Sequence, residues 1–351
     1  MIFPPFIYEP QQSIDVLKHT EEYLNSSPEM KNKIEKLSWI YHSIGRSIPQ
    51  TTENFWSGHY FPYSESWDEL QISFNLACFG FYKQAFMSLR SALEVGTLSI
   101  YFNINDEGHR TVKDWLSSAD SPDGITPRSN KIWKILNSNK NIKIYNDQFG
   151  LREEYESFGY LHNYIHTKGY KFSNRFGIAK SNMQTFEENI FCQWVESFEK
   201  IIDFLVQLHI LKYPISILEY NWFSKVGIDN PYPVLEISDI RQIKELLPNS
   251  KIKALIQIAE QDESTQGLFN MILNLPDLTE EDIDLQLKKH HQFSIEHGEG
   301  FIEWEKNQKI NLERYSKEER RKFISLIEEL RVWANENGYM ESKLDRTNKE
   351  F

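Results

Sequence analysis

Residues 66–102, SWDELQISFNLACFGFYKQAFMSLRSALEVGTLSIYF, decide the fold class of this chain. Ser66 and Glu69 have the spacing of a capping box, in which two side chains cap the start of a helix. Apolar residues then recur every three or four positions, the period of a helix that buries one face. This apolar side contains Leu70, Phe74, Ala77, Phe81, Leu89, Leu93 and Ile100. The pattern predicts one very long helix to about Phe102, in which Gly80 and Gly96 permit a close helix contact or a bend.

The same period recurs along most of the chain, so we expect an all-α protein. Ser27 is placed to cap a helix with Pro28 in its first turn. Asp147 is expected to cap a helix that runs to Lys168, with Gly169 in the C-terminal stop position. Further helix starts are expected at Thr185, which forms a second capping box with Glu188, and at Ser238, Ser250, Thr279 and Ser316.

A shift in composition near residue 228 divides the chain. Aromatic residues become sparse beyond it, and Asn230-Pro231-Tyr232-Pro233 has the composition of a linker. We therefore expect N-terminal helices and an aromatic loop (50–65) over residues 1–65, packed on a helical bundle over residues 66–228. Residues 229–351 are expected to form a smaller, charged helical domain.

The composition excludes several classes of protein. The 351 residues carry a net charge of −12, which argues against broad coating of nucleic acid. Two cysteines are too few for a disulfide framework or a cysteine-based zinc site. No stretch has the roughly 18 uncharged apolar residues of a membrane span, and the N-terminus has no secretory signal. Because glycine-rich phosphate loops and nucleophile elbows are also absent, we expect a cytoplasmic protein with no membrane partner and no cofactor.

The charge is unevenly distributed. Residues 125–146 and 157–186 contain no acid, but each stretch contains several lysines and arginines. Each stretch is either a solvated face or a local surface that attracts phosphates.

The segment Tyr160–His166, YLHNYIH, places two histidines four positions apart. Residues at this spacing share a helix face, so His162 and His166 are predicted to lie together, in line with Arg152 and Gly159. Gly159 would let another backbone approach closely. Imidazole changes its charge near neutral pH, and a helix C-terminus stabilises its cationic form. The pair is therefore either a proton-handling or anion-binding site or a half-buried structural pair.

The histidines could also hold a metal ion, and Arg90 of the 66–102 segment could act with them. A zinc site is not expected, because Asn163 stands where a metalloprotease has its glutamate and no third ligand is near in sequence. Arg90 and Glu94 lie on one helix face. They form either a structural ion pair inside the bundle or part of a phosphate site with the histidines.

Four segments in order carry a resemblance to a known family: LRSALE (89–94), the Trp115 segment, the helix from Thr126-Pro127 to Leu136, and YLHNYIH. Together they resemble bacterial proteins with a HEPN-like helical bundle, over about residues 66–213. Such proteins are often associated with abortive infection and other phage defence, and some are toxins. The resemblance implies an all-helical bundle that acts as a homodimer.

Active members of this family are metal-independent RNases with an arginine four to six residues before a histidine. No arginine of this chain has that spacing. The resemblance therefore assigns catalysis to His166, with His162, and requires Arg90 and Glu94 to act from another helix. The basic and aromatic residues expected to hold RNA are Arg152, Lys168, Tyr170, Lys171 and Arg175. The alternative is a non-catalytic helical sensor that binds a nucleotide, or a partner protein through its C-terminal domain.

Overall fold

The computed structural model describes residues 8–49, 60–104, 110–117, 126–174, 177–179, 184–228, 230–298, 300–311 and 317–342. Within these ranges every regular element is a helix and no strand occurs, so the expected all-α class is confirmed. The chain forms two compact units. The first contains Met1–Tyr220 and Pro231–Met271, and the second contains Asn221–Asn230 and Ile272–Phe351.

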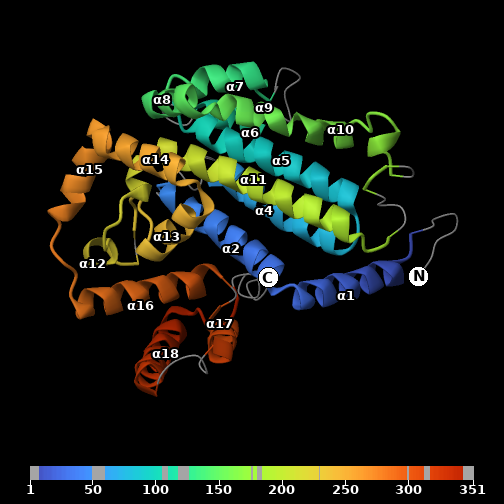
Figure 1. The fold of residues 1–351 in the computed structure, drawn as a ribbon. Helices are drawn as coiled ribbons and strands as arrows, with labels where there is room; N and C mark the ends of the chain where they lie inside the picture. Colours follow the sequence, from blue (N-terminus) through green and yellow to red (C-terminus); the bar gives the residue numbers. More distant parts are fainter. Residues whose placement is uncertain are drawn as a thin grey trace. The chain divides into compact units, whose positions relative to one another are not determined.

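Figure 1 labels the helices in chain order. Those of the first unit are α1 (Pro10–Ser26), α2 (Pro28–Ile44), α4 (Tyr60–Cys78), α5 (Tyr82–Phe102), α6 (Arg110–Leu116), α7 (Ser129–Leu136), α8 (Lys140–Phe149), α9 (Leu151–Ser157), α10 (His162–Ile165), α11 (Glu188–Lys212), α13 (Ile237–Leu246) and α14 (Asn249–Gln261). Short 3-10 turns are η1 (Gly45–Ser47), η4 (Phe158–Leu161), η5 (Tyr170–Phe172) and η7 (Pro214–Ile217). The second unit contains α12 (Phe223–Val226), α16 (Glu280–His297), α17 (Gly300–Asn311) and α18 (Lys317–Asn337), and α15 (Glu263–Leu273) ends at the boundary.

The centre of the first unit consists of α4, α5 and α11, which lie side by side (Figure 1). Their facing side chains are fully buried, among them Phe86 and Leu93 on α5 and Trp194 and Leu205 on α11. Burial of one such side chain contributes roughly 1.5–3 kcal/mol. The Trp194 indole also donates a hydrogen bond of 2.8 Å to the hydroxyl of Ser73 on α4. The apolar period of the sequence therefore corresponds to a real three-helix core.

The prediction of one helix over residues 66–102 is wrong, because this segment forms the α4–α5 hairpin. Ser66 lies within α4, where its buried hydroxyl donates to a backbone carbonyl of α5 at 2.8 Å. Glu69 accepts a hydrogen bond from Ser91 of α5 at 3.1 Å, so neither residue caps a helix. The chain turns at Gly80, whose φ of 78° lies in the left-handed region that glycine adopts without steric cost.

The other predicted helix starts have mixed outcomes. Ser27 is the N-cap residue of α2 and Pro28 its first residue, as expected. The capping box at Thr185 is wrong, because Glu187 is the N-cap residue of α11 and the Thr185 hydroxyl bonds to the Glu187 carboxylate. Ser316 and residues 50–59 of the expected aromatic loop lie outside the described ranges.

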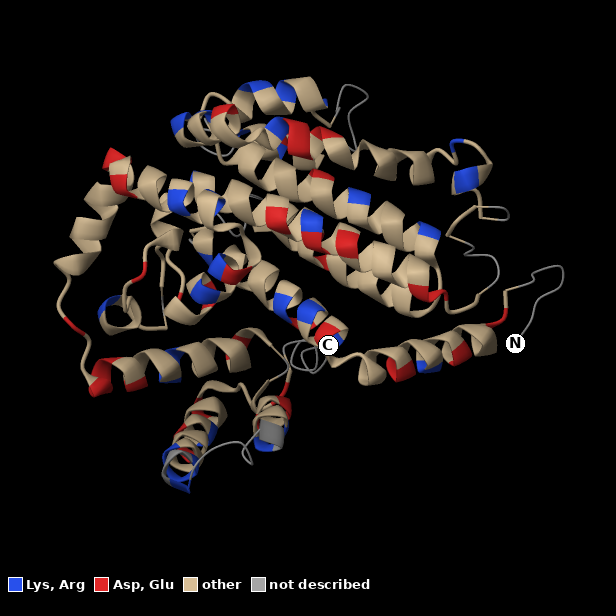
Figure 2. Ribbon diagram, in the orientation of Figure 1, with Lys and Arg blue, Asp and Glu red and all other residues tan. Residues whose placement is uncertain are grey.

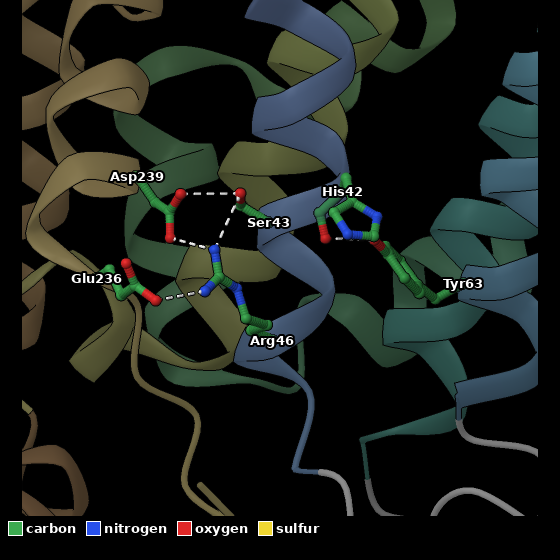
Figure 3. A network of polar contacts seen from close by, with 6 residues as sticks. All are labelled: His42, Ser43, Arg46, Tyr63, Glu236 and Asp239. Atoms are coloured by element: carbon green, nitrogen blue, oxygen red, sulfur yellow. Dashed lines mark hydrogen bonds and ion pairs between the residues drawn. The ribbon is translucent and has the colours of Figure 1, made fainter. Parts of the chain in front are cut away.

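A polar cluster holds residues 231–246 to the end of α2 (Figure 3). Arg46 donates to the carboxylates of Asp239 at 2.5 Å and Glu236 at 2.9 Å. The Ser43 hydroxyl donates to the other oxygen of Asp239 at 2.9 Å, and both of these residues are buried. Buried polar groups are stable only when paired, so this cluster fixes α13 on the first unit. The division of the chain therefore differs from the boundary expected near residue 228.

The second unit has a small core of its own, contributed by α16, α17 and α18. Its most buried residues are Ile295, Phe301, Trp304, Ile327, Leu330 and Ala334. The capping box predicted at Thr279 is confirmed: the Thr279 hydroxyl accepts from the Asp282 amide at 3.2 Å, and the Asp282 carboxylate accepts from the Thr279 amide at 2.9 Å.

Replacing Thr279 with alanine is expected to destabilise the first turn of α16 by about 1 kcal/mol, because the Asp282 amide loses its side-chain acceptor. Hydrogen exchange of that amide should become about fivefold faster. Ser238→Ala is the matched control, since Ser238 is exposed near the start of α13 and caps no amide among the described residues. Unchanged exchange at Asp282 in the Thr279 variant would contradict the cap.

Candidate functional site

The two histidines of the YLHNYIH segment lie together, as their spacing predicts. His162 begins α10 and His166 follows its last residue. Their ring centroids are 4.2 Å apart, and both side chains are exposed. Exposure disfavours the interpretation as a half-buried structural pair, and it leaves both imidazoles accessible to a ligand.

The helix that carries this pair is shorter than predicted. Asp147 lies inside α8, which Asn139 caps, and Gly150 ends α8 with a φ of 66°. After α9 the chain forms the 3-10 turn η4, so α10 has only four residues. A helix this short has a weak macrodipole.

The central helix α5 supports the turn that follows α10. The ring of Phe86 stacks on Tyr164 at 4.6 Å with an interplanar angle of 12°. One turn earlier, the buried Lys83 donates from its amine to the Thr167 hydroxyl at 2.7 Å. Thr167 has a φ of 47°, which is uncommon for a residue with a side chain, and Lys83 helps to hold it there. No local sequence pattern marks Lys83, because its partner lies 84 positions away.

The turn after α10 presents cations and a tyrosine to solvent. Lys168 and Lys171 are exposed, and Tyr170 exposes 82% of its surface. Gly169, with a φ of 85°, allows the chain to reverse between them. We call residues 162–172 the histidine tip. Figure 2 shows basic residues but no acid along this stretch, and the sequence identifies them as the two lysines. Arg175 lies outside the described residues.

Arg90 and Glu94 form the ion pair expected from their spacing, at 2.6 Å. The guanidinium also lies over the ring of Tyr155, 5.6 Å from its centroid. Its side chain is only 13% exposed, and within the described residues no hydrogen bond or ion pair joins it to either histidine. Lys83 contacts Thr167, which belongs to the histidine tip. Arg90 follows Lys83 by seven residues on α5, which places its Cα about 10 Å farther along the helix. The structure therefore pairs Arg90 with Glu94, and no described hydrogen bond or ion pair joins Arg90 to the histidine tip.

Arg152 and Gly159 do not extend the site. Arg152 pairs with Glu156 at 2.8 Å and donates to Asn130 of α7 at 3.1 Å. Among the described residues, no atom outside its own chain neighbours lies within 4 Å of where a side chain on Gly159 would begin. The interpretation that Gly159 permits close approach of another backbone within this chain is therefore wrong. The 3-10 turn also interrupts the continuous stripe predicted from Arg152 to His166.

A second site escaped the sequence analysis. Trp39, Trp67 and Phe74 line a cleft between α2, α4 and α11, together with the ring of His42. Trp39 is 63% exposed although it lies on a helix whose apolar residues are otherwise buried. The sequence does contain a signal for this site, because Trp39 falls outside the regular spacing of the apolar residues of α2. A large aromatic residue that is exposed in this way often marks a binding surface.

Comparison of the chain with protein-family models, curated proteins and solved structures finds no match. In the described part of the chain, no three His, Cys, Asp or Glu side chains lie close enough to hold a metal ion. No described helix is long and apolar enough to cross a membrane. The geometry of these surfaces is therefore the basis for a functional proposal.

Proposed function

We propose that this protein binds single-stranded RNA at the histidine tip and cleaves it without a metal ion. The observation that carries the proposal is the pair of exposed imidazoles, His162 and His166, beside Lys168 and Lys171. The resemblance to HEPN-like bundles implies the same substrate. It also implies a homodimer that acts in antiviral defence, as abortive-infection proteins and toxins do. We include this in the proposal, together with the cytoplasmic location expected from the composition.

The chemistry of the tip fits single-stranded RNA better than a duplex. Lysines attract phosphates, and an exposed tyrosine ring can stack on an unpaired base. Lys168, Tyr170 and Lys171 supply both kinds of contact within four residues, and no acid between residues 157 and 186 opposes the phosphate charge. Base stacking of this kind is sequence-tolerant, so we expect little sequence preference.

Cleavage of RNA needs proton transfer but no external nucleophile. The ribose 2′-oxygen attacks the adjacent phosphorus and the bond to the 5′-oxygen breaks, which leaves a 2′,3′-cyclic phosphate and a 5′-hydroxyl. In this proposal His166 takes the proton of the 2′-hydroxyl and His162 gives a proton to the leaving 5′-oxygen. Lys168 stabilises the charge on the phosphate, whereas Arg90 is paired with Glu94.

The cleavage experiment compares wild type, His166→Ala and His19→Ala on single-stranded RNA in EDTA. Loss of a proton-transfer group is expected to slow cleavage by about 100-fold or more. His19 is an exposed histidine on α1, so its replacement should leave the rate unchanged. Equal RNA decay with wild type and His166→Ala would refute cleavage at this site.

The non-catalytic alternative has one observation in its favour, the pairing of Arg90 with Glu94 away from the histidines. Measuring RNA affinity together with cleavage distinguishes this alternative from the RNase proposal. Lys168→Gln should weaken binding several-fold and reduce its salt dependence, whereas Lys253→Gln, an exposed lysine on α14, should not. Weakened binding by Lys168→Gln together with no cleavage by wild type would favour a non-catalytic RNA-binding protein. Equal affinity of both variants would reject the histidine tip.

A further inference from the structure

The aromatic cleft of the first unit is a second site with its own chemistry. It has a volume of about 610 Å³ and is lined by α2, α4 and one residue of α11, Phe198. A volume in this range suits a small molecule or a single side chain. The cleft is built from residues that the proposed RNA site does not use.

Its walls are aromatic and are fixed in place. The ring of His42 lies 5.8 Å from Trp39 and 5.6 Å from Trp67, so the three rings form a continuous row. Phe74 packs against the buried Trp194 at 5.9 Å. The Tyr63 hydroxyl donates to the His42 carbonyl at 3.0 Å, which fixes the backbone of α2 at this point (Figure 3).

The polar groups at the edge of the cleft present acceptors. The Gln71 amide nitrogen donates to the Trp67 carbonyl and to Asp68, and the Asn75 amide nitrogen donates to the Gln71 carbonyl at 3.0 Å. Neither amide oxygen has a hydrogen-bond donor among the described residues, so both can accept from a ligand. The Ser38 hydroxyl also donates within its own helix, to a carbonyl at 2.9 Å.

The charge of the cleft is negative. Glu35 is its only charged lining residue among those described, and no described side chain forms a hydrogen bond or ion pair with it. Of the lysines on α2, Lys33 pairs with Glu199 at 2.6 Å and Lys36 with Glu245, and no described ion pair joins the exposed Lys31 to Glu35. A phosphate would meet this carboxylate with no lysine or arginine among the described lining residues to offset it, so a nucleotide is disfavoured.

We propose that this cleft binds an organic cation, whose ammonium group lies among the indole rings of Trp39 and Trp67 with Glu35 as its counter-charge. Aromatic faces attract cations through the ring quadrupole, most strongly for tryptophan, and quaternary ammonium groups are bound by such sites. A neutral apolar ligand would use the same rings but would gain nothing from Glu35 or from the acceptors.

The test uses choline as the probe and 3,3-dimethylbutan-1-ol as its neutral analogue of the same shape. Binding is followed by isothermal titration calorimetry and by the NMR signals of the tryptophan indole N–H groups. We expect choline to bind about fivefold or more tightly than the alcohol. Equal affinity for the two compounds, or no shift of any indole signal at millimolar choline, would overturn the proposal.

Variants locate the effect. Glu35→Gln should weaken choline but not the alcohol, and Trp39→Ala, at an exposed position whose loss leaves the core intact, should weaken choline by at least fivefold. His166→Ala should leave choline binding unchanged, so the outcome is independent of the RNA proposal. An unaltered choline affinity in Glu35→Gln would contradict the assigned counter-charge.

A peptide that contains trimethyllysine distinguishes the source of the cation. Tighter binding of this peptide than of choline indicates a protein side chain, and weaker binding indicates a free metabolite.

Discussion

Replacing Gly96 with valine is expected to lower the free energy of unfolding of the first unit by about 3 kcal/mol. Gly96 lies where α5 crosses α4 and α11, and a Cβ atom there would stand 2.8 Å from the Ser66 hydroxyl and 2.9 Å from the Leu205 methyl groups. The Ser66 hydroxyl cannot move aside, because it donates to the Ala92 carbonyl at 2.8 Å and is bonded to the Tyr41 hydroxyl at 2.7 Å. Urea unfolding followed by circular dichroism measures the change.

Gly159→Ala is the matched control for this prediction. Gly159 is exposed, and apart from its chain neighbours no atom of the described residues lies within 4 Å of the position its Cβ would take. Alanine there should change the stability by less than about 0.5 kcal/mol. A Gly96→Val variant as stable as this control would mean that α4, α5 and α11 do not meet as closely as described.

Replacing Asp203 with asparagine is expected to stabilise the first unit by about 2 kcal/mol at pH 8 and to have little effect at pH 4. Asp203 lies on α11, and its burial raises the pKa of the carboxyl to about 6, although the nearby Lys251 opposes the shift. Its oxygen accepts from Gln207 at 2.6 Å, and Gln207 in turn accepts from Tyr145 at 2.7 Å. Asparagine keeps the acceptor without the charge.

The sign of this pH dependence follows from the raised pKa. The folded state holds the Asp203 proton more tightly than the unfolded state, whose carboxyl has the ordinary value of 3.8. The stabilisation that comes from tighter proton binding by Asp203 is therefore fully present below about pH 4, and it is lost as the pH rises through 6. Asp114→Asn, at an exposed carboxylate on α6, should change little at either pH. A stabilisation by Asp203→Asn that is equal at both pH values would contradict the burial of a charged group.

The fold class was predictable because apolar period and caps are local signals. Ser27 and Thr279 both stand at true helix starts, and the Thr279 hydroxyl caps an amide only three residues away. The α4–α5 hairpin was not predictable from the same signals. Its apolar period continues across the turn at Gly80, and Ser66 is hydrogen-bonded to a helix that follows it rather than to its own.

The candidate site divides in the same way. The contacts of His162 with His166 and of Arg90 with Glu94 follow from a spacing of four, so the sequence predicts both. The distance of Arg90 from the histidines depends on how α9 and α10 pack along α5, which no local pattern contains. Trp39 and its cleft likewise need three helices that are far apart in sequence.

The central claim is that RNA binds at the histidine tip, and NMR of the histidine rings during titration with a single-stranded RNA tests it most directly. We expect the ring signals of His162 and His166 to shift together, because both rings are exposed and 4.2 Å apart. The signals of His209, whose ring is fully buried on α11, should stay in place. RNA binding that leaves the signals of His162 and His166 unmoved would contradict the proposed function.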